Sequence, residues 1–304
     1  YPAVKASQHY SRKYIFLAIG LAVVACIIVL WPSRVNSPVK KNNGGETRDL
    51  AKTSNRIRFI ATGDTIAHDA LNAQAKKSDG SYDYYQFMKP LQKYFDAADV
   101  RFCNQAVPGG GPAFGISGYP VFNSPLEVAH DLNKLGCNVV NTGTNHTFDK
   151  GQKVIDAELE DWDKQPNMLA VAGANRNADE QAKIRYFTVK GVRFAFLSYS
   201  TYSNSVPANS YGLNMYNSDT AQQQVTTARA NADIVLVSMR WGTEYSPAIN
   251  ANQTEISQKL ADWGADVVLG HGPHVLEPVK QLTGKDGRKT LVWYSLGNFL
   301  NAQI

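Results

Sequence analysis

The sequence DVVLGHGPH, at residues 266–274, is an apolar run that ends in two histidines set among glycines and a proline. A short, continuous apolar run that stops at glycine is typical of a buried β-strand. The segment before it, residues 252–264, reads as a helix that ends in glycine. His271 and His274 follow the strand directly. They either bind a metal ion or are polar residues of a tight turn, and the rest of the sequence bears on which interpretation holds.

The same alternation continues through the chain from about residue 56. Helix-like segments separate several short apolar runs, and no internal repeat interrupts them. Continuous apolar strands separated by helices predict an α/β protein in which helices cover the sheet on both faces. The predicted strands are residues 57–63, 99–104, 138–143, 168–173, 192–200, 233–241, 266–270 and 290–295.

Polar side chains follow five of these predicted strands. In α/β sheets, ligands bind outside the carboxyl ends of the strands. Polar residues at the same end of five strands indicate one shared site rather than five unrelated turns. The residues are Asp64, Asn104, Asn145 with His146, Arg240, and His271 with His274.

Longer motifs extend the pattern to a family. They are GD at 63–64, YPVFNSP at 119–125, TNHTFDKG at 144–151, RWGTEY at 240–245, WGADVVLGHGPHVLEP at 263–278 and YSLGNF at 294–299. In this order they resemble the calcineurin-like metallophosphoesterases, and within them the CapA family of capsule and poly-γ-glutamate synthesis proteins. The resemblance covers about residues 56–304. It implies a four-layer α/β/β/α sandwich with its site at the strand ends.

The resemblance also implies a metal centre. Carboxylate, amide and imidazole ligands suit divalent ions such as Mn²⁺, Fe²⁺ or Zn²⁺, and a pair of such ions can clamp a phosphate ester and activate a water. His146 would act beside the metal as a general acid or as a positioning group. The implied metal ligands are Asp64, Asn104, Asn145, His271 and His274.

Three positions depart from the family pattern. Ile66 stands where a phosphoesterase usually has histidine, Ala106 where the family commonly has glutamate, and Arg240 where it commonly has the histidine of HWG. Arginine carries only donors and stays protonated, so Arg240 is not a metal ligand. We assign Arg240 to the catalytic site as an anion-binding group, with a structural salt bridge to Glu244 as the alternative. Glu244 and Asn298 are candidate substrate-binding residues, and Asn298 either faces the site or caps a turn.

An uncharged apolar segment lies near the N-terminus. Its eighteen residues, 14–31, would span about 27 Å as a helix, close to the thickness of a bilayer core. A small-residue cleavage site is missing, which favours a membrane anchor over a signal peptide. We therefore predict a cytoplasmic segment at residues 1–13, a transmembrane helix at 14–31, a flexible extracellular linker at 32–55 and a CapA-type domain at 56–304.

Basic residues lie on both sides of the predicted transmembrane helix, so their distribution does not fix its orientation. A short N-terminal segment with a large C-terminal domain most often exports that domain. This predicts a single-pass protein of the cell membrane with its large domain outside. The chain begins at Tyr1 without a methionine, so we interpret it as a fragment that lacks its native N-terminus. Whether the domain at 56–304 is also cut short at its C-terminal end is left open.

Charge and cysteine content narrow the alternatives further. The net charge of +5 is mild, and much of the basic excess lies before residue 59, which argues against nucleic acid as a partner. Cys103 and Cys137 fall in apolar runs, where we expect free, buried cysteines. A disulfide between them is disfavoured, because Cys103 would end one parallel strand and Cys137 would begin another.

The sequence leaves two functions open. In the first, a membrane-anchored extracellular domain takes part in the biosynthesis or export of an anionic envelope polymer. Its site is partly degenerate, and other capsule synthesis and export membrane proteins are its partners. In the second, the domain is an active metal-dependent hydrolase that cleaves a phosphoester, or an amide or ester bond, of such a polymer. The missing ligands favour the first function, whereas the retained residues at the strand ends favour the second.

Overall fold

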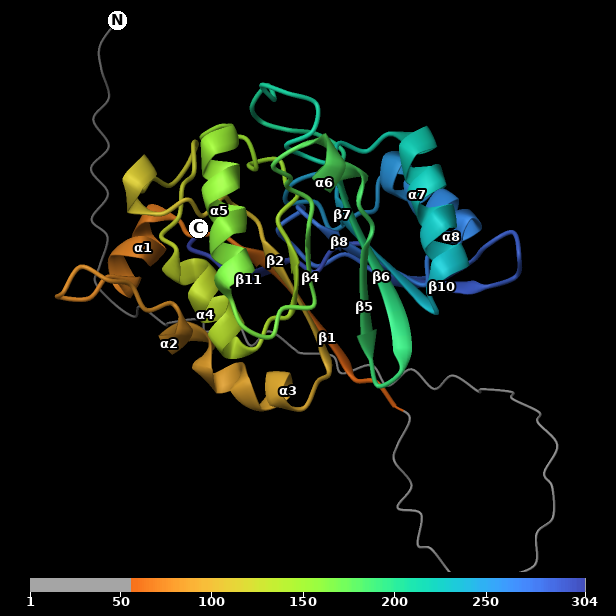
Figure 1. The fold of residues 1–304 in the computed structure, drawn as a ribbon, viewed down its shortest axis with the longest axis horizontal. Coiled ribbons are helices and arrows are strands. Elements are labelled where there is room, and N and C mark those ends of the chain that lie inside the picture. The colour runs from red at the N-terminus through yellow and green to blue at the C-terminus, as the bar shows by residue number, and fades with distance from the viewer. Residues whose placement is uncertain (1–55, 304) are drawn as a thin grey trace, which may run out of the picture.

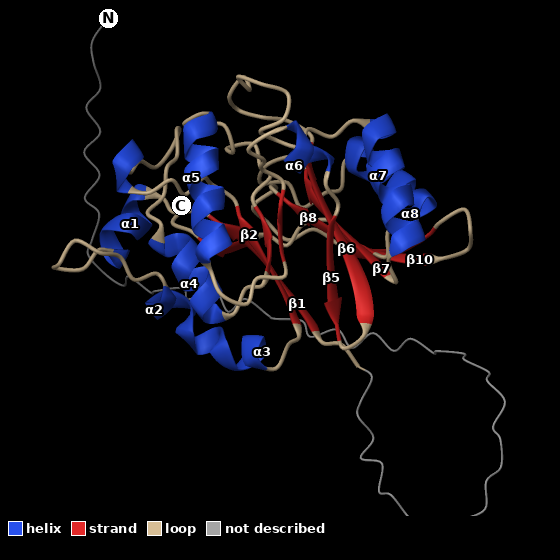
Figure 2. Cartoon of the chain, viewed as in Figure 1, coloured by secondary structure: helices blue, strands red, loops and turns tan. Residues whose placement is uncertain are grey.

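The computed structural model describes residues 56–303, which form two β-sheets with helices around them (Figure 1, Figure 2). The predicted α/β class is thereby confirmed. The segments predicted at 1–13, 14–31 and 32–55 lie outside the described residues. Within residues 56–303, no helix is both long and apolar enough to cross a membrane.

The first sheet contains five parallel strands. Its order is β11 (Asn298–Leu300), β1 (Phe59–Thr65), β2 (Val100–Gln105), β3 (Val139–Asn141) and β4 (Ala170–Ala172). The last described strand, β11, pairs with the first, β1, although they are far apart in the sequence. Asp64 pairs in register with Asn104 on one side and Asn298 on the other. Three predicted site residues are therefore aligned across this sheet.

The second sheet has six strands. Its order is β5 (Arg185–Val189), β6 (Val192–Ser200), β7 (Ile234–Arg240), β8 (Val267–His271), β10 (Lys289–Trp293) and β9 (Val279–Thr283). The four central strands are parallel, and the edge strands β5 and β9 are antiparallel to their neighbours. Arg240 pairs in register with His271, so these two residues leave the sheet at the same edge.

Three buried clusters separate four layers. Phe102 of the first sheet and Phe196 of the second lie in the cluster between the sheets, with their ring centroids 6.0 Å apart. A second cluster joins helices α1–α5 to the outer face of the first sheet, and a third joins α7 and α8 to the outer face of the second (Figure 1). The order of layers is therefore α/β/β/α.

The helices are α1 (Asp69–Ala75), α2 (Tyr85–Met88), α3 (Gln92–Asp96), α4 (Glu127–Leu135), α5 (Gln152–Lys164), α6 (Ala178–Ala182), α7 (Ser218–Asn231) and α8 (Ala251–Trp263), with 3₁₀ turns at Lys89–Leu91 and Pro112–Phe114.

Helix α8 shows how the local sequence leads to the strand that bears the two histidines. Asn250 and Gln253 form a capping box, in which each side chain bonds the other residue's backbone N–H. Gly264 ends the helix in the left-handed conformation, with φ at 102°. The chain then turns directly into β8. The helix predicted at 252–264 and the strand predicted at 266–270 are both confirmed to within one residue.

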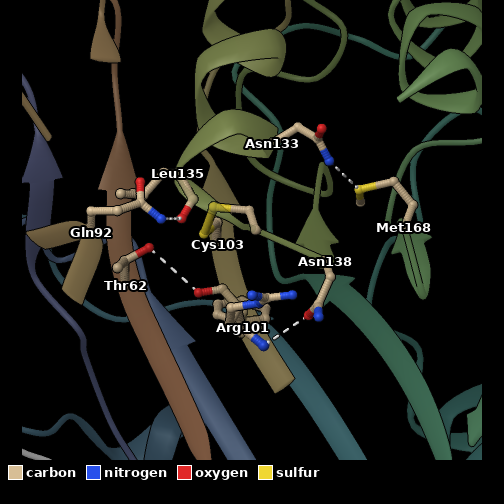
Figure 3. The surroundings of a disulfide bond; sticks show 10 residues. Thr62, Gln92, Arg101, Cys103, Asn133, Leu135, Asn138 and Met168 are labelled. Carbon is tan, nitrogen blue, oxygen red and sulfur yellow. Dashed lines mark hydrogen bonds between the residues drawn. A yellow bond between two sulfur atoms is a disulfide. The ribbon is translucent and has the colours of Figure 1, made fainter. Parts of the chain in front are cut away.

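The expectation of two free cysteines is wrong, because Cys103 and Cys137 form a disulfide with a Cα–Cα distance of 5.8 Å (Figure 3). Cys103 lies within β2 rather than at its end, opposite Val140 of β3. Cys137 lies before β3, just after the left-handed Gly136 that ends α4. Both cysteines belong to the cluster between the first sheet and its helices. The tight turn after α4 thus brings Cys137 back over the strand, which strand ends alone do not predict.

We expect the disulfide to contribute measurably to stability. It closes a loop with a sequence separation of 34 residues, for which the chain-entropy model gives about 3–4 kcal/mol. The reduced protein should unfold at a lower temperature than the oxidised protein, as measured by circular dichroism. A variant with Cys103→Ala and Cys137→Ala should match the reduced protein and no longer respond to reductant. Equal melting temperatures for oxidised and reduced wild-type protein would contradict this expectation.

Candidate functional site

The carboxyl ends of the two sheets are brought together by the segment at residues 294–297. The backbone N–H of Leu296 donates to the carbonyl oxygen of Gly270 in β8, at 2.9 Å. The N–H of Asp64 in β1 donates to the carbonyl oxygen of Gly297, at 2.8 Å. One short segment therefore bonds a strand of each sheet. As a result, the polar residues that follow the strands of both sheets face a common cleft.

The cleft has a volume of about 530 Å³ and lies at this edge of the sandwich. Seven of the nine predicted site residues line it, so the structure brings these residues together in one place. Asn104 and Asn298 do not line it. The seven residues are Asp64, Asn145, His146, Arg240, Glu244, His271 and His274.

Asp64 is a buried carboxylate with partners on both oxygens. Asn104 Nδ2 donates to its Oδ1 at 2.6 Å, and His274 Nδ1 lies 2.8 Å from its Oδ2. Burial by itself raises the pKa of Asp64, but the side-chain contact with His274 and the nearby Arg240 guanidinium oppose it, and the net shift of the pKa is downward. Asp64 is therefore ionised at neutral pH.

Asn104 and Asn298 contact other site residues on the side away from the cleft, Asp64 and His274 respectively. The side-chain oxygen of Asn104 accepts from Asn141 Nδ2 at 2.7 Å while its amide group donates to Asp64. The side-chain oxygen of Asn298 lies 3.1 Å from His274 Nδ1. Their amide groups position the charged and imidazole groups instead of facing the cleft.

His274 has a left-handed backbone, with φ at 63°, which is uncommon for a residue with a side chain. Two contacts fix this turn. The N–H of Tyr245 donates to the carbonyl oxygen of Pro273 at 2.8 Å, and the hydroxyl of Ser295 donates to the carbonyl oxygen of Val275 at 2.7 Å. The unusual conformation aims the imidazole ring at the cleft. A left-handed backbone costs conformational free energy at a residue other than glycine, and residues with such strained backbones cluster at functional sites.

His271 is fully buried. Its Nε2 lies 2.9 Å from the hydroxyl of Ser238 and 3.3 Å from Asn141 Nδ2, whereas its Nδ1 has no hydrogen-bond partner among residues 56–303. Burial lowers the pKa of His271 to about 3, so the ring is neutral at physiological pH. A neutral imidazole with one free nitrogen can form one hydrogen bond with a ligand, as donor or as acceptor according to its tautomer.

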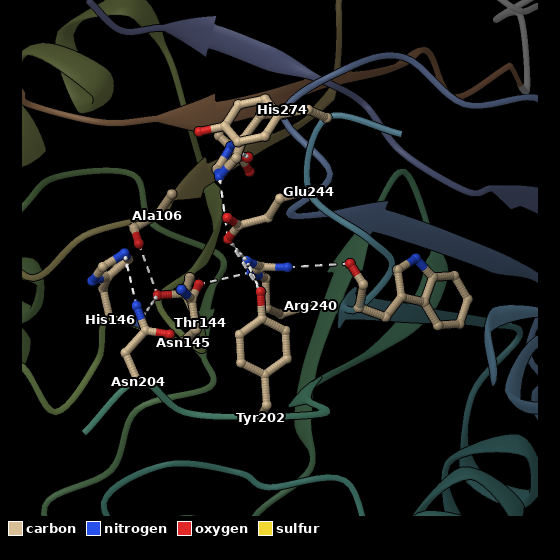
Figure 4. A network of polar contacts seen from close by, with 12 residues as sticks. Ala106, Thr144, Asn145, His146, Tyr202, Asn204, Arg240, Glu244 and His274 are labelled. Atoms are coloured by element: carbon tan, nitrogen blue, oxygen red, sulfur yellow. Dashed lines mark hydrogen bonds and ion pairs between the residues drawn. The ribbon is translucent and has the colours of Figure 1, made fainter. Parts of the chain in front are cut away.

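Arg240 ends β7 with its side chain almost completely buried, and all of its nitrogens have partners (Figure 4). Nε donates to the Asn145 side-chain oxygen at 2.7 Å, and Nη1 donates to the carbonyl oxygen of Trp241 at 3.2 Å. Nη2 donates to Glu244 Oε1 at 3.0 Å and also to the hydroxyl of Tyr202. The salt bridge to Glu244 that the sequence left as an alternative is therefore present.

His146 carries a partner that the sequence assignment missed. Its Nδ1 lies 2.7 Å from Asp149 Oδ2, and its Nε2 lies 3.3 Å from Asn204 Nδ2. Phe122 packs edge-on against the ring, with centroids 4.7 Å apart. A carboxylate that fixes one imidazole nitrogen leaves the other oriented for proton transfer or for binding. Asp149 belongs to the motif at 144–151, so its position three residues after His146 was a usable signal.

The residues present do not fit a divalent metal centre of the implied kind. No group of three His, Cys, Asp or Glu side chains within the described part of the chain is arranged to hold a metal ion. The Asn145 oxygen, a predicted ligand, is bonded to Arg240. The guanidinium also places a fixed positive charge beside Asp64, which opposes the binding of a second cation.

Two further cleft residues come from a loop that no motif covers. Tyr202 and Asn204 lie between β6 and α7 and reach the cleft from the second sheet. Ser205 Oγ lies 3.4 Å from Asp149 Oδ1 and ties the same loop to the first sheet's side of the site. The loop is polar and without periodicity, so the sequence held no signal for these residues.

The chain is similar to known capsule proteins over almost its whole length. It is 25% identical over 305 residues to the PGA biosynthesis protein CapA of Bacillus subtilis, covering 97% of this chain and 74% of that protein. It is 23% identical over 310 residues to the capsule biosynthesis protein CapA of Bacillus anthracis, covering 98% and 70%. A solved putative 5'-nucleotidase from Staphylococcus aureus, in complex with alpha-ketoglutarate, has a TM-score of 0.45 and 12% identity, covering 81% of this chain and 54% of that one. That score is too low to carry an inference.

The family comparison agrees with the motifs on which the resemblance was based. Residues 58–303 match the family described as bacterial capsule synthesis protein PGA_cap, which is nearly the entire described domain. The chain belongs to the PGA_cap family of bacterial capsule synthesis proteins.

Proposed function

We propose that this protein takes part in the synthesis or export of an anionic capsule polymer of the poly-γ-glutamate type, and that its cleft binds a segment of that polymer. The similarity to CapA proteins of two bacilli supports the first part. The second part rests on one observation, the buried guanidinium of Arg240 at the cleft. Arginine in a site shielded from water is suited to bind carboxylate or phosphate groups.

The location that we propose is the outer face of the cell membrane, with the predicted helix at 14–31 as a single anchor. Other membrane proteins of polymer synthesis and export would be its partners. The disulfide between Cys103 and Cys137 supports an exported domain, because disulfides persist in oxidising compartments and are rare in the cytosol.

One observation favours the alternative, a metal-dependent hydrolase that cleaves a phosphoester or an amide or ester bond of the polymer. His146 is paired with Asp149 at 2.7 Å and faces the same cleft as Asp64 and His271. An oriented imidazole beside a carboxylate is suited to general acid or base catalysis. Such an enzyme would bind Mn²⁺, Fe²⁺ or Zn²⁺ in spite of the ligands that are missing.

Polymer binding gives the direct test. The purified chain should bind poly-γ-glutamate with an affinity that falls as salt is added, and should not bind an uncharged polymer. Arg240→Met should weaken binding by about tenfold or more because the buried cation is lost. Titration calorimetry gives the affinities, and circular dichroism checks that the variant is folded.

The same samples distinguish the alternative. Polymer length, measured by gel filtration after long incubation with each metal, should stay constant. Shortening of the polymer that disappears in His146→Ala would establish the hydrolase instead. Equal binding by wild type and a folded Arg240→Met protein would refute the proposed role of the cleft.

Metal content is expected to be low. After dialysis, wild-type protein should retain less than one equivalent of Mn²⁺ or Zn²⁺. Ala106→Glu combined with Arg240→His adds a carboxylate and an imidazole and removes a fixed positive charge, so this protein should retain more metal. Ala106→Glu alone is the control that leaves the arginine in place. Two equivalents in wild-type protein, measured by mass spectrometry, would overturn the expectation.

The topology can be tested on intact cells. Protease added outside should release a domain that begins between residues 40 and 55, within the predicted linker. A fragment that appears only after lysis would show that the domain lies inside.

A further inference from the structure

The carboxylate of Glu244 is held at the cleft by two donors from two segments, and an imidazole lies near it. Arg240 Nη2 donates to its Oε1 at 3.0 Å, and the hydroxyl of Tyr202 donates to the same oxygen at 3.3 Å. His274 Nε2 lies 3.8 Å from it (Figure 4). Burial raises the pKa of Tyr202 to about 12, so its hydroxyl remains a donor at physiological pH. Arg240 and Tyr202 thus form a site that binds one carboxylate oxygen, with His274 beside it.

The loop that carries Glu244 is fixed by its backbone and not by this carboxylate. Gly242 is left-handed, with φ at 86°, and a Cβ there would come within 2.7 Å of the Pro273 ring. Tyr245 is left-handed as well, and its N–H is bonded to the carbonyl oxygen of Pro273. The turn is thus anchored on both sides of Glu244. The Glu244 side chain can leave its two donors by rotation alone, without movement of the main chain.

Exposure differs sharply between the two partners of the ion pair. The Arg240 side chain is 2% exposed, whereas that of Glu244 is 42% exposed. The buried cation is therefore permanent, and the anion opposite it is exchangeable with solvent. Replacing one carboxylate by another leaves the charge of the site unchanged, and the displaced Glu244 becomes hydrated in water. Such an exchange avoids leaving the guanidinium unpaired, which would be the costly state.

We propose that Glu244 occupies the carboxylate-binding position of the cleft as an internal competitor, and that a free carboxylate of the polymer binds by displacing it. This inference rests on the proposed function and gives it a substrate class, a chain that bears free carboxylates. It also changes the role of Glu244 from a group that binds substrate to one that lowers the affinity for it. The ligand chemistry is the one the position already holds, a carboxylate.

The alternative is an ordinary ion pair between residues four apart in sequence. Glu255 and Lys259 of α8 are a matched example. Lys259 Nζ lies 2.6 Å from Glu255 Oε1, and 64% of the Glu255 side chain is exposed. Among residues 56–303, the Glu255 carboxylate has no donor other than Lys259. Glu255→Gln therefore removes the same charge at the same spacing, away from the cleft.

The test measures binding of glutarate and of poly-γ-glutamate to the purified full chain by titration calorimetry. Glu244→Gln and Glu244→Ala should each tighten binding by about three- to tenfold, because the competing charge is gone. Glu255→Gln should leave the affinity unchanged. Tyr202→Phe in the Glu244→Gln background should reverse part of the gain, because one donor to the carboxylate is removed.

Each other outcome overturns a defined claim. If wild type binds the polymer but Glu244→Gln binds equally or more weakly, the competitor role is refuted and the proposed function stands. If neither protein binds any carboxylate, the proposed function falls, and this inference falls with it. If the Glu244→Gln substitution increases the affinity for inorganic phosphate more than the affinity for glutarate, the assignment to carboxylates is refuted.

Discussion

The close contact of residues 294–297 with both sheets is the constraint on which the site depends. A Cβ at Gly270 would lie 1.9 Å from the carbonyl oxygen of Tyr294, and a Cβ at Gly63 would lie 1.9 Å from that of Gly297. Only glycine permits the chain to pass so near to a strand of each sheet. Any side chain at either position would push the sheets apart at this edge. The cleft exists because two glycines, one on each sheet, accept the same short segment.

The buried guanidinium follows from that geometry. A charge taken out of water must be hydrogen-bonded on every side to be tolerated. Arg240 meets this requirement with groups from both halves of the sandwich, since Asn145 follows the first sheet and Tyr202 and Glu244 follow strands of the second. The sheets must therefore be docked before the arginine is satisfied. The hydrogen bonds of Arg240 therefore depend on the docking of the two sheets, and the positive charge of the site depends on Arg240.

Much of the fold and part of the site could be predicted from the sequence, for identifiable reasons. Apolar runs such as 266–270 mark buried parallel strands, and a residue just after such a run must lie at the carboxyl edge, which located Asp64 and His271. Sequence periodicity says nothing about irregular segments, so Tyr202 was not found. The disulfide was rejected because the prediction placed Cys137 on a strand, whereas it lies in the turn after α4. Strand order and turn geometry decide such contacts, and neither is encoded in local pattern.

A guanidinium at the end of β7 changes what kind of ligand the cleft can take. A divalent ion would need negative charge concentrated around it, but here the carboxylate of Asp64 already lies close to His274 and within the field of Arg240. The positive group is covalently fixed, so it does not have to be acquired from solution or retained by coordination. Its planar donors suit the flat carboxylate group better than a spherical charge does. The proposed binding of an anionic polymer would therefore need no metal ion, with Asp64 and the neutral His271 setting the polarity of the surrounding wall.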